Sequence, residues 1–119
     1  MKSTKAAGRY AKALLELALD QQKIEVIENN MQQIITVANE AHDFQVFLSS
    51  PLIKVDKKLE VIKSIFGNFD PISISFLEMV ASNRRESLIT EIASAFLTQL
   101  KEYRGIVPVT IISAKTLDA

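Results

Sequence analysis

TKAAGRYAKALLELALDQQ, residues 4–22, is the stretch that decides the fold, because its apolar residues recur at the spacing of an α-helix. Ser3 or Thr4 is placed to cap the start of this helix. At roughly 100° per residue, the apolar positions cover about 240° of the helix surface, whereas a helix that packs on a bundle with one face needs a narrower stripe. These positions are Ala6, Ala7, Tyr10, Ala11, Ala13, Leu14, Leu15, Leu17, Ala18 and Leu19.

Five more helical patterns follow, and short connections separate them. Asp70 and Pro71 give the strongest boundary signal, since a capping carboxylate precedes a proline at the first helical position. Asp56 is predicted to cap a helix that stops at Gly67, a residue free to adopt the left-handed closing conformation. Consecutive helices with short loops pack on one another, so we predict an all-α six-helix bundle over residues 1–104. The predicted helices after the first are 24–41, 43–48, 56–66, 71–83 and 86–103.

The end of the chain changes character. Gly105 is predicted to end the helices, and residues 106–113 are rich in β-branched residues that favour a strand. A lone strand has no partner for its backbone groups. Either it pairs with another chain, or residues 105–119 begin a second, α/β domain of a longer protein. We favour the second interpretation, and we expect this tail to be frayed without its sheet.

Composition excludes several classes of function. The 14 basic and 14 acidic residues cancel, so the chain has no electrostatic footprint for nucleic acid. Cysteine is absent and His42 is the only histidine, which leaves no support for a catalytic triad or a multi-histidine metal site. The three glycines are isolated, so no phosphate-binding loop is present. No apolar run reaches the roughly 20 residues that insertion across a membrane requires. We predict a binding module with no catalytic residue, cofactor or metal.

Two helices carry more apolar surface than a bundle needs. Besides residues 4–22, the helix after Asp70 has apolar positions over about 220°. Both helices are either central and buried nearly all round, or part of each face is exposed to receive an amphipathic helix of another protein. Periodicity leaves these alternatives open. For the second one, Ala6, Ala7 and Ala13 would permit close approach, while Tyr10 and Met79 would serve as anchors.

Four segments, in the same order along the chain, resemble one family. They are GRYAKALLELA at 8–18, FLSSPLI at 47–53, FLEMVASNRR at 76–85, and Gly105 followed by VTIISA at 109–114. Together they resemble the delta subunit of F-type ATP synthase, whose mitochondrial counterpart is the oligomycin sensitivity-conferring protein. One departure is Gly8, where the family often has a basic residue or alanine.

The resemblance implies a non-catalytic stator subunit of the H⁺-transporting ATP synthase, which links the α3β3 head to the peripheral stalk. Helices one and five would form an apolar groove for the N-terminal helix of an α subunit, and the missing C-terminal domain would bind the b subunits. As part of the ATP synthase, the subunit would be peripheral on the cytoplasmic face of the bacterial plasma membrane. A free-standing helical adaptor is the alternative. The implied partner-binding residues are Tyr10, Ala13, Leu14, Leu17, Met79, Val80 and Asn83.

Overall fold

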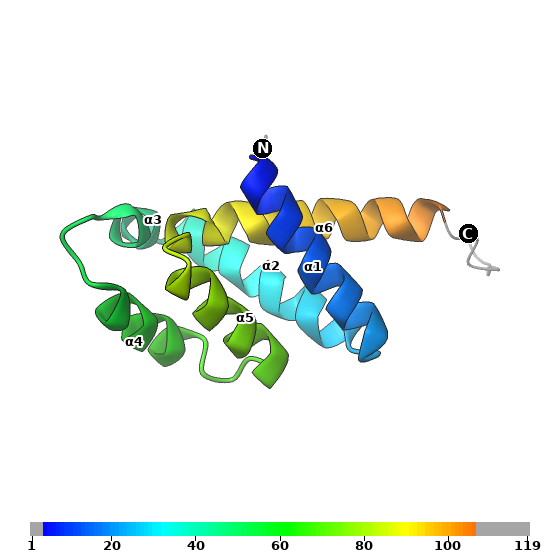
Figure 1. Ribbon diagram of the computed structural model, residues 1–119, viewed down its shortest axis with the longest axis horizontal. Coiled ribbons are helices and arrows are strands. Elements are labelled where there is room, and N and C mark those ends of the chain that lie inside the picture. The colour runs from blue at the N-terminus through cyan, green and yellow to red at the C-terminus, as the bar shows by residue number, and fades with distance from the viewer. Residues whose placement is uncertain (1–3, 107–119) are drawn as a thin grey trace.

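The computed structural model describes residues 4–106, and this part of the chain forms six α-helices and one 3₁₀ turn (Figure 1). The all-α prediction is confirmed for these residues. The proposed strand and tail at 107–119 lie outside the described residues. The elements are α1 (Lys5–Asp20), α2 (Ile24–Glu40), α3 (His42–Ser49), α4 (Val55–Ile65), α5 (Pro71–Ser82), η1 (Glu86–Leu88) and α6 (Ile89–Ile106).

The long helix α6 is the element on which α1 and α2 pack. α1 and α2 make their closest backbone approach to α6, and α1 crosses α6 at an angle (Figure 1). Ala7, Ala11 and Ala18 have no exposed surface. Small side chains let two helices approach closely, so this alanine stripe explains why α1 lies near α6. The backbone of α5, by contrast, comes closest to α4, α2 and η1.

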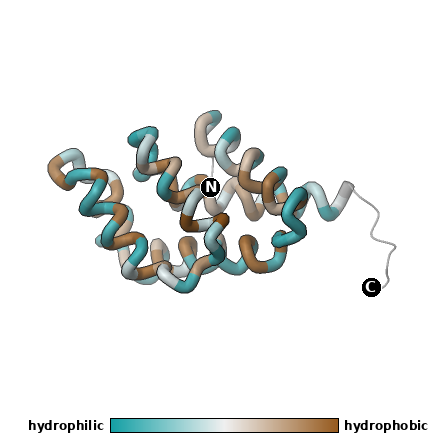
Figure 2. Tube along the Cα trace, turned by 60° about the horizontal axis from the view of Figure 1, so that its bottom comes forward, coloured by the Kyte–Doolittle hydropathy of each residue, from teal (hydrophilic) through white to brown (hydrophobic). Residues whose placement is uncertain are grey.

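A single apolar core lies between the helices. Hydrophobic and hydrophilic stretches alternate along each helix in Figure 2, as expected of amphipathic helices that bury one face. The core draws on every helix, so it fixes the position of each relative to the others. Its largest fully buried side chains are Phe66, Phe96, Leu14, Ile27, Met31, Ile34, Leu48, Ile62, Leu77, Ile89, Ile92 and Leu100.

Two predicted helix caps are confirmed. The Thr4 hydroxyl accepts a hydrogen bond from the Ala7 backbone N–H at 3.1 Å, which satisfies a free donor in the first turn of α1. The Asp70 carboxylate accepts from the Ile72 N–H at 2.9 Å, directly ahead of Pro71 at the first position of α5.

Three predicted helix boundaries are wrong in detail. Lys54 is the N-cap of α4 and makes no side-chain capping bond, whereas Asp56 lies inside the first turn. Gly67 does not have the left-handed conformation. Glycine suits this position for a different reason: the Cβ of any other residue would lie 2.8 Å from the Lys63 carbonyl oxygen, which is too close. α6 continues through Gly105 to Ile106 instead of ending at Gly105.

Left-handed residues close α1 and α5 instead. Gln22 has φ 57° and Arg84 has φ 60°, a region that side chains other than glycine seldom adopt. After α5, the Arg84 N–H donates to the Ala81 carbonyl and the Arg85 N–H to the Val80 carbonyl. This 5→2 and 6→1 pattern is the Schellman motif. The backbone of these two residues does the capping.

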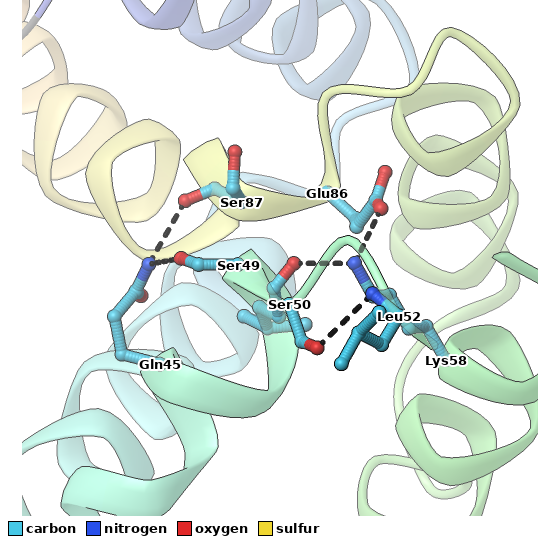
Figure 3. Close-up of polar contacts among 8 residues, drawn as sticks. Gln45, Ser49, Ser50, Leu52, Lys58, Glu86 and Ser87 are labelled. Carbon is cyan, nitrogen blue, oxygen red and sulfur yellow. Dashed lines mark hydrogen bonds and ion pairs between the residues drawn. The ribbon is translucent and has the colours of Figure 1, made fainter. Parts of the chain in front are cut away.

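A buried ion pair joins α4 to the end of α3 and to η1 (Figure 3). Lys58 Nζ lies 2.8 Å from Glu86 Oε2 and donates to the Leu48 carbonyl at 2.7 Å. Gln45 Nε2 adds a second link from α3 to η1 through the Ser87 carbonyl at 3.1 Å. Both charged side chains are about nine-tenths buried or more. The network therefore links α4, the end of α3 and η1 through buried polar contacts.

Removing one partner of this pair should be strongly destabilising, because the other charge stays buried without compensation. We expect Lys58→Met or Glu86→Leu alone to lower the free energy of unfolding by about 3–5 kcal/mol. The double variant should recover a large part of that loss. Urea denaturation of the two single variants and the double variant measures the coupling. Losses that simply add would show that the two charges do not stabilise one another.

Candidate partner-binding surface

α1 and α5 lie side by side and run in opposite directions, and one polar contact joins them near the start of α1. Asn83, the C-cap residue of α5, donates from Nδ2 to the Tyr10 hydroxyl at 2.9 Å. The Tyr10 ring also meets Phe76 edge-on, with 6.3 Å between ring centroids. Such an aromatic pair contributes roughly 0.5–1.5 kcal/mol beyond its buried area. Side chains, rather than close backbones, therefore set the spacing of the two helices here.

A second polar contact joins the opposite ends of the two helices. Lys23, just beyond α1, lies with Nζ 3.0 Å from Asp70 Oδ2, ahead of α5. The Asp70 backbone N–H donates to Asn30 Oδ1 at 3.1 Å, and Asn30 is buried in α2. The hydrogen bond from the Ile72 N–H lowers the pKa of the Asp70 carboxyl below its usual 3.8; partial burial opposes this effect and Lys23 reinforces it. α5 is thus held at both ends.

The exposed part of this region has apolar side chains on both helices. Tyr10, Ala13 and Leu17 share one face of α1, at spacings of three and four residues. Met79 and Asn83 share the corresponding face of α5. Leu17 and Met79 are each 41% exposed, Ala13 and Asn83 are exposed, and Tyr10 is half-buried. We call these five residues the α1–α5 surface.

The two remaining predicted partner-binding residues do not reach this surface. Leu14 and Val80 have no exposed area and belong to the core directly beneath it. Ala7 is also fully buried, so it is not available for the close approach of a partner. The interpretation in which α1 and α5 are buried nearly all round is wrong, because each helix keeps a partly exposed apolar stripe beside its buried one.

Exposed apolar side chains also occur elsewhere. Val26, Val46, Leu52 and Ile65 are 38%, 56%, 92% and 45% exposed, on α2, α3, the α3–α4 loop and α4. They belong to four different segments. The α1–α5 surface differs because two helices contribute to it and polar contacts hold both of its ends.

Phe76 is a residue of this region that the sequence-derived site omits. It lies seven residues before Asn83, so the two share one face of α5, and this spacing was a usable signal. The partnership between Lys23 and Asp70 carried no such signal, since 47 positions separate them.

Side chains suited to metal binding do not cluster in the described part of the chain. Within residues 4–106 there is no group of three or more histidine, aspartate or glutamate side chains able to hold a metal ion. His42 is exposed at the first position of α3. No helix in this range is long and apolar enough to span a bilayer.

Comparison with known proteins identifies the family. The sequence model of the ATP synthase delta (OSCP) subunit matches residues 6–119, nearly the whole chain. The chain belongs to the ATP synthase delta (OSCP) subunit family. The resemblance drawn from the four sequence segments is thereby confirmed.

Individual members of the family agree. The chain is 35% identical over 117 residues to ATP synthase subunit delta of Carboxydothermus hydrogenoformans, covering 98% of this chain and 66% of that relative. Identity to the subunit of Flavobacterium psychrophilum is 31% over 119 residues, covering 100% of this chain and 67% of the relative. The chain therefore spans about two thirds of the length of these delta subunits.

A solved structure shares the fold. A chain in the cryo-EM structure of the Toxoplasma gondii mitochondrial ATP synthase hexamer superposes with a TM-score of 0.72 at 26% identity. The match covers 78% of this chain and 53% of that one. The helical architecture is therefore shared with a chain of a mitochondrial ATP synthase.

The lowered pKa of Asp70 makes a prediction about acid stability. A carboxyl with a depressed folded-state pKa stabilises the fold above its unfolded pKa, and this contribution is lost as pH falls through the folded value. Asp70→Asn keeps a capping oxygen but has no charge. The stability advantage of the natural chain over this variant should be constant at pH 5–7 and shrink below about pH 4. Urea denaturation at pH 6 and pH 3 measures it, and an advantage equal at both would contradict the assignment.

Proposed function

We propose that the chain is a non-catalytic stator component of an F-type ATP synthase. In this proposal the α1–α5 surface binds the N-terminal helix of an α subunit, as the family resemblance implies, and thereby links the α3β3 head to the peripheral stalk. The supporting observation is the partial exposure of Leu17 on α1 and Met79 on α5, between the Tyr10–Asn83 and Lys23–Asp70 contacts.

The arrangement fits the recognition of an amphipathic helix. Such a helix places residues at i, i+3, i+4 and i+7 into an apolar surface between two supporting elements. Leu17 and Met79 supply flexible apolar contacts, and Met suits variable packing. Ala13 has a short side chain, so a guest backbone can approach α1 closely at that point. Because both ends of α5 are held by polar contacts, little ordering of the host would oppose binding.

This mode of binding suits a component that resists torque. The head must be held stationary against the turning rotor, which requires slow dissociation and a stiff joint. Buried apolar contacts provide most of the binding energy of such interfaces, whereas exposed ion pairs contribute little. As part of the ATP synthase, the subunit would lie peripherally at the cytoplasmic face of a bacterial plasma membrane. Attachment to the b subunits would use the C-terminal domain of the full-length subunit.

The runner-up is a free-standing helical adaptor that uses the same surface for a different amphipathic helix. Titration with a synthetic peptide of the α-subunit N-terminus distinguishes the two. Amide chemical-shift changes that cluster on Tyr10, Leu17, Met79 and Asn83 are expected for the stator component. Changes elsewhere, or none, would leave the adaptor as the better account.

Substitution at the surface should weaken binding without unfolding the domain. We expect Leu17→Asp or Met79→Asp to reduce affinity for the α-subunit peptide by roughly 10- to 100-fold, because each substitution removes apolar contact and places a carboxylate against the guest. Isothermal titration calorimetry provides the affinities.

Val46→Asp is the matched control, since Val46 is 56% exposed on α3, outside the α1–α5 surface. Its affinity for the peptide should equal that of the natural chain. An equal loss in the control would show that binding does not depend on the proposed surface.

A further inference from the structure

The charges on the outer face of α1 are segregated along its length. Lys5, Arg9 and Lys12 lie in the first half, and Glu16 and Asp20 lie in the second. All five are exposed, and none of them forms an ion pair with another residue in the range 4–106. α1 thus has a basic N-terminal half and an acidic C-terminal half, and no ion pair within residues 4–106 neutralises these charges.

This order is the opposite of what stabilises a helix by itself. Acidic residues are favourable near a helix N-terminus and basic residues near its C-terminus. The other helices with charged ends follow that rule: α2, α3, α4 and α6 each have an acidic residue in the first turn, and α4 and α6 also end with a basic residue. α1 has no acidic residue in its first turn and no basic residue in its last. The stability of the helix therefore does not account for its charge order.

The segregated charges border the α1–α5 surface. Arg9 lies four residues before Ala13, and Asp20 lies three residues after Leu17, so each is a neighbour of the surface on the same side of the helix. Glu16 is three residues beyond Ala13 and continues the acidic half. On the opposite edge, the Glu78 carboxylate of α5 already pairs with Lys63 of α4. A guest helix would therefore meet its main electrostatic gradient along α1.

We propose that the surface selects the direction of the guest as well as its apolar face: the guest is an amphipathic helix with an acidic N-terminal half and a basic C-terminal half, and it lies parallel to α1. This inference rests on the proposed function. Helices commonly carry acidic residues first and basic residues last. A parallel guest with that order brings its acidic half to Arg9 and its basic half to Glu16 and Asp20. The dipoles of parallel helices repel, but they amount to half charges at solvated ends, less than the full side-chain charges.

The direction is measurable on the isotope-labelled 119-residue chain. The probe is the α-subunit N-terminal peptide carrying a nitroxide at one end or the other. A label at the peptide N-terminus should broaden the amide signals of residues 5–9, and a label at the C-terminus those of residues 16–20. The reversed pattern, or equal broadening from both labels, would overturn the directional inference while leaving the proposed function intact. Absence of binding would overturn both.

A charge exchange tests the cause. Arg9→Glu with Glu16→Lys keeps the net charge but changes the formal charge of the first half of α1 from +3 to +1 and that of the second half from −2 to 0, so most of the gradient is removed. Affinity for the peptide should fall roughly tenfold at low salt and recover towards that of the natural chain at about 1 M salt. The melting temperature should not fall, since the exchange weakens a charge order that is unfavourable for the helix itself. The matched control is Lys57→Glu with Glu60→Lys, which inverts an exposed pair on α4. Equal affinities in the exchanged, control and natural chains would contradict the proposed role of the gradient.

Discussion

The close packing of α1 on α6 is the constraint on which the rest of the structure depends. The backbones of the two helices approach closely and Ala7, Ala11 and Ala18 of α1 are fully buried, so α1 cannot turn about its axis without exposing this stripe. Because the alanine stripe is buried, the adjacent stripe of Tyr10, Ala13 and Leu17 lies at least partly exposed beside α5. The α1–α5 surface is thus a direct consequence of the orientation of α1 about its own axis.

Buried side chains in the core and polar contacts at its ends hold α5 in place, instead of close backbone packing on α1. Tyr10 with Asn83 and Lys23 with Asp70 hold its two ends, and the buried pair of Lys58 and Glu86 sets the segments that precede and follow it. Hydrogen bonds have demanding geometry, so they specify spacing more sharply than apolar contacts do. A pre-arranged surface of this kind lowers the entropic cost of binding a rigid partner.

Much of this fold follows from local sequence signals, and the site follows only in part. Helix positions and the caps at Thr4 and Asp70 depend on spacing and side-chain type within a few residues, so they were predictable. The boundary between the buried and the exposed residues of α1 was not predictable, because Leu14 and Leu17 are both apolar and lie on adjoining parts of one helix face. Only the packed fold decides that Leu14 is core and Leu17 is partly exposed. The partners Tyr10 and Asn83 are 73 positions apart, beyond the range of periodicity.

Disulfide trapping in the assembled ATP synthase tests the central claim most directly. The chain has no cysteine, so a single cysteine at Leu17 or Met79 can be paired with cysteines placed along the α-subunit N-terminus. We predict that both positions form a cross-link to α under mild oxidation and that a cysteine at Val46 does not. Cross-linking from Val46 with none from Leu17 or Met79 would contradict the assignment of the α1–α5 surface as the site that holds the catalytic head.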